Sequence, residues 1–186
     1  MRDALLDNIK ELLQQERSRP LFIVIDGPAG AGKTTLAREI LSYVGVGEVI
    51  HGDDLYNGWA DALTSSLEKR INNWVLQPLR DGKMPKYQRY DWIEGRYREE
   101  IDLPESSLII LEGVGVALPS VALAADLSIW IDIDPEFGLE RVLARDGGAI
   151  ADEMRQWMLA QEAFFALHHN RENCMLHLPH GAPAQP

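Results

Sequence analysis

Residues 21–35 have the sequence LFIVIDGPAGAGKTT. The first five are a continuous apolar, partly β-branched run, which predicts a central parallel strand covered on both faces. Residues 27–34 then fit the pattern G-x-x-x-x-G-K-[ST] completely. After them, apolar residues recur at helical spacing from Leu36 to Val44. Strand, glycine loop and helix therefore follow one another as a phosphate-binding P-loop requires.

The residue types of this loop suit a nucleotide. Glycines let backbone N–H groups converge on phosphate oxygens, and the following helix directs the positive end of its dipole at the same anion. Lys33 is expected to neutralise the β and γ phosphates, Thr34 to place its hydroxyl on Mg²⁺, and Thr35 to cap the loop or contact the α-phosphate. ATP, or a similar nucleotide, and Mg²⁺ are the expected cofactors. The predicted nucleotide-binding residues are Gly27, Pro28, Ala29, Gly30, Ala31, Gly32, Lys33, Thr34 and Thr35. The alternative, a ligand-free glycine turn, gives the Lys-Thr pair no purpose.

Strands and helices alternate along the rest of the chain. Apolar runs predict further strands at 49–50, 107–111 and 127–131. Helical spacing predicts helices at 3–17, from 63 up to Pro78, at 135–145 and at 151–169. This order predicts an α/β fold of the P-loop NTPase type, with three α/β/α layers and a central, mainly parallel sheet of about five strands. We expect one domain over residues 1–186 and a lid at about 145–156. We also expect the Pro-, His-, Gly- and Ala-rich segment His177–Pro186 to be frayed, with a flexible tail at 179–186.

Composition limits the possible partners. The chain has 186 residues and a formal net charge of −11, so its average field would repel a nucleic acid backbone. The single cysteine, Cys174, cannot form an internal disulfide, and the start of the sequence lacks a secretory signal pattern. The apolar stretch 114–131 is interrupted by Pro119 and Asp126, which argues against a membrane span. We expect a cytoplasmic protein without nucleic acid or membrane partners, and leave a homo-oligomer open.

A pair of acidic residues follows the second predicted strand in His51-Gly52-Asp53-Asp54-Leu55-Tyr56. In a parallel sheet this strand end lies on the same edge as the P-loop, so a carboxylate there can face the γ-phosphate. With this segment, Tyr90-Asp91-Trp92 and Leu111-Glu112-Gly113, the chain resembles the uridine kinase and phosphoribulokinase group of P-loop kinases over about residues 21–170. The resemblance implies that Asp53 deprotonates an acceptor hydroxyl, that Tyr56 lies on the substrate side, and that Glu112 assists the metal with Thr34 and Asp53.

Arginines in the helix 135–145 are further candidates for catalysis. Arg141 and Arg145 are four residues apart, so both can reach one anion, and the resembled family uses arginines here and in the lid that follows. The alternative is a solvated helix face paired with Glu140 or Asp146. Arg155 is a weaker candidate in the lid. With Asp53 and Lys33, these two arginines complete the predicted catalytic set.

The acceptor-binding residues are predicted on weaker grounds. Trp59 and Asp61 follow the Asp53 segment and could supply stacking and a hydroxyl acceptor, although an aromatic residue is more often part of the core. Tyr90 and Asp91 enter through the resemblance, and Arg96 could contact an anionic acceptor or simply belong to a solvated charged run. His168 and His169 adjoin on a helix without zinc-spaced partners, so we predict no structural metal site.

The pattern predicts a kinase that transfers the γ-phosphoryl group of ATP to a hydroxyl of a small molecule. The resemblance favours a nucleoside such as uridine or cytidine. However, Gly95 stands where the family would have a base-contacting histidine, and the segment after Tyr56 is shorter, so another acceptor such as pantothenate, a sugar or a nucleotide remains open. A nucleotide-binding regulator or a slow NTP hydrolase is the alternative of another class.

Overall fold

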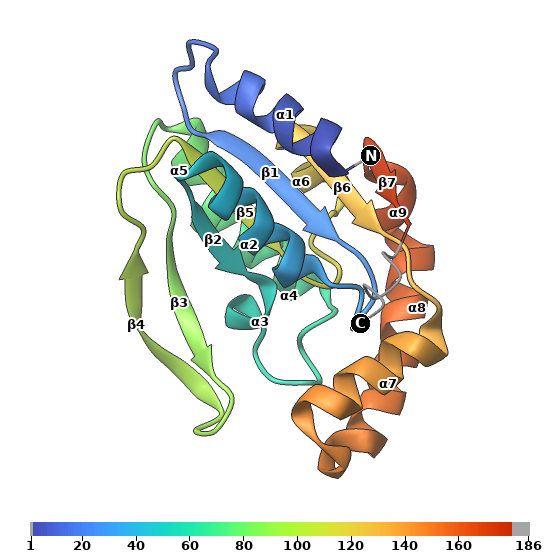
Figure 1. The fold of residues 1–186 in the computed structure, drawn as a ribbon. Coiled ribbons are helices and arrows are strands. Elements are labelled where there is room, and N and C mark those ends of the chain that lie inside the picture. Colours follow the sequence, from blue (N-terminus) through green and yellow to red (C-terminus); the bar gives the residue numbers. More distant parts are fainter. Residues whose placement is uncertain (1, 180–186) are drawn as a thin grey trace.

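The computed structural model describes residues 2–179. Within them, a five-stranded sheet has the order β2-β5-β1-β6-β7, and every neighbouring pair is parallel (Figure 1). The four longer segments are the strands that apolar runs predicted. The strands are β1 (Leu21–Asp26), β2 (Glu48–His51), β5 (Leu108–Glu112), β6 (Leu127–Ile131) and β7 (Leu176–Leu178). The parallel sheet of about five strands is thus confirmed.

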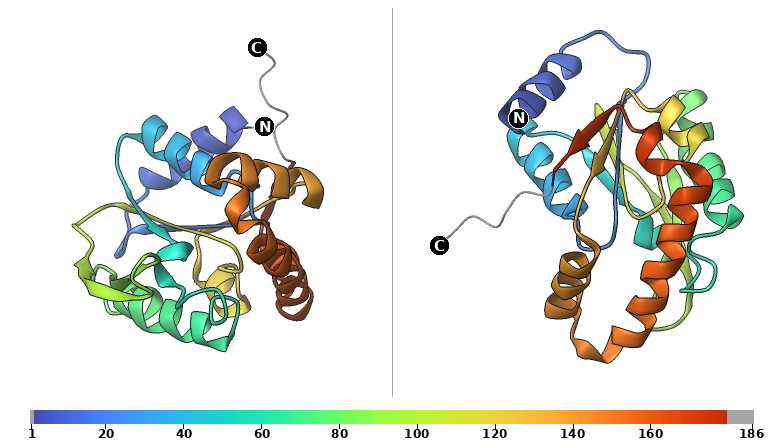
Figure 2. Two further views of the ribbon diagram at one scale, coloured as in Figure 1. Left: turned by 90° about the horizontal axis from the view of Figure 1, so that it is seen from below. Right: turned by 90° about the vertical axis from the view of Figure 1, so that its right-hand side faces the viewer.

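Helices cover both faces of this sheet. Figure 2 shows α1 (Arg2–Leu13) and α2 (Lys33–Val44) on one side, and α4 (Ser65–Ile71), α6 (Pro119–Ala124) and α8 (Ala151–His168) on the other. The strand residues alternate between two buried clusters, with Ile23 and Ile25 facing α1 and α2, and Phe22 and Val24 facing the opposite layer. These two cores make the predicted three-layer α/β/α P-loop fold.

The carboxyl ends of the three strands β1, β2 and β5 meet at one edge of the sheet. Glu112 at the end of β5 is in register with Ile25 on β1 and with His51 on β2. The P-loop leaves β1 at this edge, and the four-residue helix α3 (Gly52–Leu55) leaves β2 beside it. Helix α7 (Pro135–Asp146) starts a few residues after β6. Segments far apart in the sequence therefore reach the same place.

The helix predicted to end at Pro78 continues past it. After α4 the backbone widens into a π-helical segment, Asn72–Leu76, and then α5 (Gln77–Arg80) includes the proline. A proline has no N–H and its ring clashes with the carbonyl four residues earlier in a regular α-helix. The wider turn directly before Pro78 relieves that clash, so the prediction of the end was wrong. Thr64 caps the start of α4 by accepting from Ser66 N at 3.2 Å.

Three strands of the structure were not predicted. A separate antiparallel hairpin consists of β3 (Lys86–Asp91) and β4 (Arg96–Asp102), and lies beside β2 and α3 (Figure 1). At the other end of the chain, His177 and Leu178 belong to β7, where Leu178 is buried and its carbonyl accepts from Asp132 N at 2.9 Å. The expected fraying is therefore wrong for these two residues, and residues 180–186 lie outside the described part.

The remaining elements are short. A 3-10 turn, Gly148–Ile150, joins α7 to α8, and α9 (Asn170–Asn173) connects α8 to β7. The segment 145–156, predicted as a lid, is therefore the end of one helix, a tight turn and the first turns of the next. In residues 2–179, no helix is both long and apolar enough to cross a membrane.

Candidate active site

The P-loop follows β1 as a tight backbone turn. Gly27, Gly30 and Gly32 have φ angles of 148°, 79° and 93°, which L side chains rarely adopt. A Cβ on Gly30 would also lie 2.3 Å from the carbonyl oxygen of Gly138 in α7. The loop therefore needs glycine at these three positions for its shape, and at Gly30 also for its packing against α7.

Lys33 is the first residue of α2 and its ammonium folds back onto the loop. Its Nζ donates to the carbonyl oxygens of Gly27 at 2.8 Å and Pro28 at 2.9 Å. Burial lowers the pKa of Lys33, while the carboxylates of Glu112, Asp26 and Asp53 oppose that shift. A buried cation surrounded by carboxylates is thus held next to the loop, where an anionic ligand would stabilise it further.

Glu112 ends β5 and links the P-loop to β2. Its Oε1 accepts from Thr34 Oγ1 at 2.8 Å and lies 2.6 Å from His51 Nδ1. Burial acts to raise the pKa of Glu112, but the contacts with His51, Lys33 and Thr34 lower it below its ordinary value. The same contact raises the pKa of His51. Glu112 is therefore held as a carboxylate beside the Thr34 hydroxyl.

Asp53 lies on α3, across from Lys33 and Glu112. Its side chain is open to the pocket, and its main-chain oxygen accepts from Trp92 Nε1 at 3.1 Å. The surrounding protein raises the pKa of Asp53 by desolvation, and the nearby Glu112 carboxylate adds to the shift. A carboxyl group with a raised pKa is more basic than an ordinary aspartate, which suits a group that accepts a proton.

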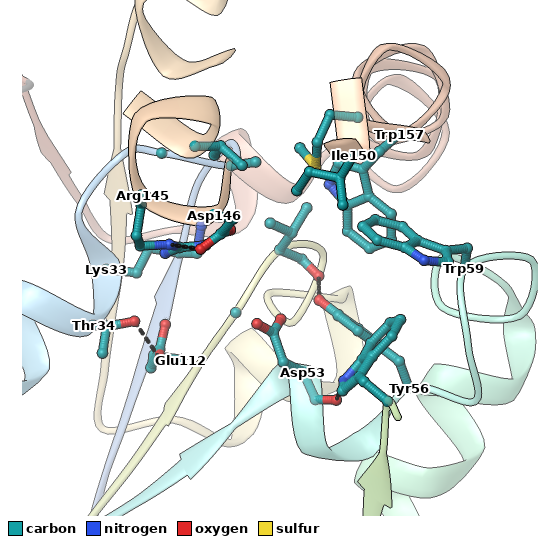
Figure 3. Close-up of a pocket in the computed structure, with 17 residues that line it drawn as sticks. Lys33, Thr34, Asp53, Tyr56, Trp59, Glu112, Arg145, Asp146, Ile150 and Trp157 are labelled. Carbon is teal, nitrogen blue, oxygen red and sulfur yellow. Dashed lines mark hydrogen bonds and ion pairs between the residues drawn. The ribbon is translucent and has the colours of Figure 1, made fainter. Parts of the chain in front are cut away.

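These residues line one cavity of about 370 Å³ with two chemically different ends. In Figure 3, Lys33, Thr34, Glu112 and Arg145 lie to one side of Asp53, while aromatic side chains lie to the other. The lining residues are Ala29, Gly30, Lys33, Thr34, Asp53, Tyr56, Trp59, Trp92, Glu112, Gly113, Val114, Val142, Arg145, Asp146, Ile150, Met154 and Trp157. The cavity can therefore hold a phosphate group at one end and a flat apolar group at the other.

Comparisons with known proteins show which proteins this chain resembles in sequence and fold. No family model matches the chain. A uridine kinase of Clostridium perfringens is 28% identical over 146 residues, covering 69% of each chain. The solved structure of a possible uridine kinase from Bacillus stearothermophilus superposes with a TM-score of 0.66 at 16% identity, covering 95% of this chain and 98% of that one. The chain is thus similar to uridine kinases in sequence, and it shares the fold of P-loop kinases.

A second relative differs in size. The inorganic pyrophosphatase TTM1 of Arabidopsis thaliana is 26% identical over 146 residues, which cover 73% of this chain. Those residues are 22% of the plant protein, so this chain spans about a fifth of the length of that relative. The similarity therefore leaves most of the plant protein without a counterpart in this chain.

The predicted arginines of this P-loop protein lie in different surroundings. Arg145 lines the cavity and donates to Asp146 at 2.7 and 2.6 Å. Arg141 approaches the P-loop from outside, since a Cβ on Gly32 would lie 3.9 Å from its Nη1. Arg155 pairs with Asp152 at 2.7 Å and does not line the cavity. The structure therefore brings Arg145 and Arg141 to the P-loop, but not Arg155.

The predicted acceptor residues divide into two groups. Tyr56 and Trp59 line the cavity. Asp61 instead forms an ion pair with Arg70 and accepts from Thr64 Oγ1, because it belongs to the turn that begins α4. The other three lie in the β3–β4 hairpin outside the cavity: Tyr90 is buried, Asp91 caps the hairpin turn, and Arg96 pairs with Glu94.

Sequence reasoning missed the buried carboxylate of Asp26, the last residue of β1. Its two oxygens accept from the backbone N–H groups of Gly27, Gly115 and Ala117 and from Asn170 Nδ2, at 2.6 to 3.0 Å. Burial raises the pKa of Asp26, although these donors and Lys33 oppose the shift. The sequence signal that could have revealed Asp26 is a charged residue placed between an apolar strand and a glycine-rich loop.

Gln161 was missed as well. It lies on the buried face of α8 with Trp157 and Met154, and its Oε1 accepts from Ala29 N of the P-loop at 3.1 Å. Trp157 was not among the predicted site residues, but its ring lines the cavity. One helix face therefore contacts both the P-loop and the far end of the cavity.

The site suits a metal-bound nucleotide. No side chain caps the N-terminus of α2, so its first amides face the loop as donors for an anion. Thr34 and Glu112 supply two neighbouring oxygen atoms, and Mg²⁺ usually takes one or two protein oxygens together with substrate phosphates. In the described part of the chain, His, Cys, Asp and Glu do not gather in groups of three or more that could hold a metal by themselves.

Proposed function

We propose that this protein is an ATP-dependent kinase that transfers the γ-phosphoryl group to a hydroxyl of a small molecule, with a pyrimidine nucleoside such as uridine or cytidine as the leading acceptor. The supporting observation is the position of Asp53 between the two ends of one cavity. A phosphate group beside Lys33 and an acceptor at the aromatic end would place the hydroxyl next to this carboxylate. The similarity to uridine kinases supports the nucleoside.

In this proposal each residue has one task. The P-loop amides and Lys33 bind the phosphates and neutralise their charge. Asp53 orients the acceptor hydroxyl and takes its proton as the oxygen attacks the γ-phosphorus and the bond to the β-phosphate oxygen breaks. Thr34 and Glu112 would hold Mg²⁺, which when bound offsets phosphate charge. Arg145 and the start of α8 cover the cavity and limit the access of water.

The pyrophosphatase similarity raises a hydrolytic alternative. A phosphate hydrolase needs the phosphate end of the cavity and an oriented water, but has no use for an extended apolar end. The aromatic side chains next to Asp53 therefore favour an organic acceptor. We place such an enzyme in the cytoplasm, with small molecules rather than nucleic acid or membrane as its partners.

The test is ADP formation from ATP with Mg²⁺, measured with and without added acceptors. The panel contains uridine, cytidine, adenosine, ribose, pantothenate, a nucleoside monophosphate and inorganic pyrophosphate. Stimulation by uridine or cytidine, with the phosphorylated nucleoside identified by mass spectrometry, is the expected result. A flat panel with appreciable hydrolysis, or release of phosphate from pyrophosphate, would refute the kinase assignment.

A further inference from the structure

Four aromatic side chains form the far end of the cavity, and we call Tyr56, Trp59, Trp92 and Trp157 the aromatic box. They come from the segment after α3, from the β3–β4 hairpin and from α8. Trp59 packs edge-on against Trp92 and Trp157, with ring centroids 5.3 and 5.5 Å apart. Tyr56 contacts Trp92 and Trp157 at 6.5 and 5.6 Å. The box is thus a continuous ring-lined wall built from distant segments.

Two of the four polar side-chain atoms of this box are already used by the protein. The Tyr56 hydroxyl donates to the carbonyl of Val114 at 2.6 Å, and Trp92 Nε1 donates to the main chain of Asp53. The neighbouring lining side chains are aliphatic or thioether groups, from Val114, Val142, Ile150 and Met154. Beyond Asp53, the described side chains at this end offer a ligand no amide, imidazole, guanidinium or carboxylate, and only the indole N–H groups of Trp59 and Trp157 remain.

The charged lining residues lie at the other end. Lys33 and Thr34 belong to the P-loop, and Glu112 accepts a hydrogen bond from Thr34. The guanidinium of Arg145 is held by the carboxylate of Asp146 (Figure 3). The hairpin residue Gly95, whose backbone has φ of 66°, has no side chain to extend towards the box. An acceptor in the box would therefore meet ring faces and aliphatic groups, with one carboxylate directed at its hydroxyl.

We propose that the kinase selects its acceptor by the flat face of a ring and not by hydrogen bonds to the ring edge, with Trp157 and Trp59 as the specificity-determining residues. A pocket that hydrogen-bonds its substrate discriminates by about 10⁴ or more against an analogue lacking the polar group, whereas an apolar pocket discriminates by only about 10 to 200. The substrate class is thus a hydroxyl compound with a planar ring. The polar groups at the edge of that ring should have little effect on kcat/KM. This inference rests on the proposed function.

The test compares kcat/KM for uridine, cytidine, 3-methyluridine, the phenyl C-riboside and ribose. We expect the four ring-bearing acceptors to fall within about 200-fold of one another and ribose to fall below all of them. A preference for uridine over the phenyl C-riboside of about 10⁴ or more would overturn the inference while leaving the nucleoside kinase intact. If no acceptor is phosphorylated, the proposed function fails. The binding of the phenyl C-riboside then tests the inference about the aromatic box by itself.

Binding is measured from quenching of tryptophan fluorescence by the phenyl C-riboside without ATP. Trp157→Leu should weaken this binding, and raise KM for every ring-bearing acceptor, by about 5- to 100-fold, with KM for ATP unchanged; Trp157→Phe should restore most of the loss. Trp59, which is 44% exposed, provides a second variant, Trp59→Leu, with little risk to folding. Trp74→Phe, outside the box and packed on Tyr97, is the control. Absence of quenching, or equal effects of Trp74→Phe and Trp59→Leu, would refute the role of the box.

Discussion

The side chain of Gln161 in α8 accepts a hydrogen bond from the backbone N–H of Ala29 in the P-loop, at 3.1 Å. Gln161 is buried, so no water replaces this acceptor readily. Four residues earlier on the same helix, Trp157 lines the opposite end of the cavity. Helix α8 is therefore a rigid connection between the loop that would bind phosphate and the wall that would bind the acceptor.

Replacing Gln161 with methionine should weaken nucleotide binding. The variant keeps the length and volume of the side chain but leaves the Ala29 N–H without its acceptor, so the loop is less well fixed before binding. A net contribution of about 1 kcal/mol for one hydrogen bond corresponds to an ADP affinity about fivefold lower, measured by calorimetry. Gln156→Met, on the exposed face of the same helix, is the matched control. Equal affinities for the two variants would show that the contact does not shape the loop.

The sequence predicted those parts of the fold and of the site that depend on residues close together in the chain. The P-loop is contiguous, and both its strand and its helix carry strong periodic signals, so its place at the carboxyl edge of a parallel sheet follows from local pattern. Asp53 and Glu112 could be placed at that edge because each directly follows or ends a predicted strand. In the structure both residues line the same cavity as Lys33.

The sequence could not predict pairings of isolated polar residues. Asn170 lies 144 positions from Asp26, and Gln161 lies 132 positions from Ala29. Single glutamines and asparagines in helices have no periodicity, and their burial is decided by tertiary packing. The hairpin was missed for a related reason, because its strands are mostly solvated and β3 buries only Tyr87 and Tyr90.

Lys33→Ala should abolish most nucleotide turnover. The substitution removes the ammonium held against the loop carbonyls of Gly27 and Pro28, and thereby the charge that would neutralise the transferring group. Loss of one preorganised donor of this kind lowers rates by roughly 10² to 10³. ADP formation under saturating acceptor is the measurement. Lys83→Ala removes an exposed lysine and should retain the parent rate; similar rates for both variants would contradict the assignment.

Asp53→Asn should separate binding from transfer. The amide keeps the shape of the side chain but cannot accept the acceptor proton, so kcat should fall by about 10² to 10⁴ while ADP affinity changes little. Because the pKa of Asp53 is raised above its ordinary value of 3.8, the wild-type rate should decline on acidification at a higher pH than an ordinary aspartate would give. Asp54→Asn is the neighbouring control, since Asp54 lies beside Arg89 instead. A fully active Asp53→Asn would rule out the base.

Asp26→Asn should destabilise the whole fold. The carboxylate accepts from three backbone N–H groups and from Asn170, and an amide would turn one of these positions into a contact between two donors. A buried donor left unsatisfied costs about 1 to 3 kcal/mol. The urea midpoint of unfolding should fall by a corresponding amount without a change in slope. An unchanged midpoint would mean that Asp26 is protonated or replaceable at no cost.

Asp126 gives stability a defined dependence on pH. It pairs with Arg17 at 3.0 Å and Arg19 at 2.7 Å, and accepts from Phe22 N at 2.8 Å. Although burial opposes the shift, these contacts hold its pKa below the ordinary value of 3.8. Since the folded state binds the proton less tightly than the unfolded state, the stabilisation is complete above that ordinary value and is lost as pH falls through the lower, folded value.

The comparison that isolates this effect is wild type against Asp126→Asn, by urea unfolding at about pH 7 and at steps down to about pH 3. Wild type should be the more stable protein at neutral pH, and its advantage should shrink as the solution is acidified, because protonation removes from Asp126 the charge that the variant never had. Other carboxylates titrate in both proteins alike and cancel in the difference. A difference that stays constant over this range would show that the ion pairs with Arg17 and Arg19 contribute nothing to stability through charge.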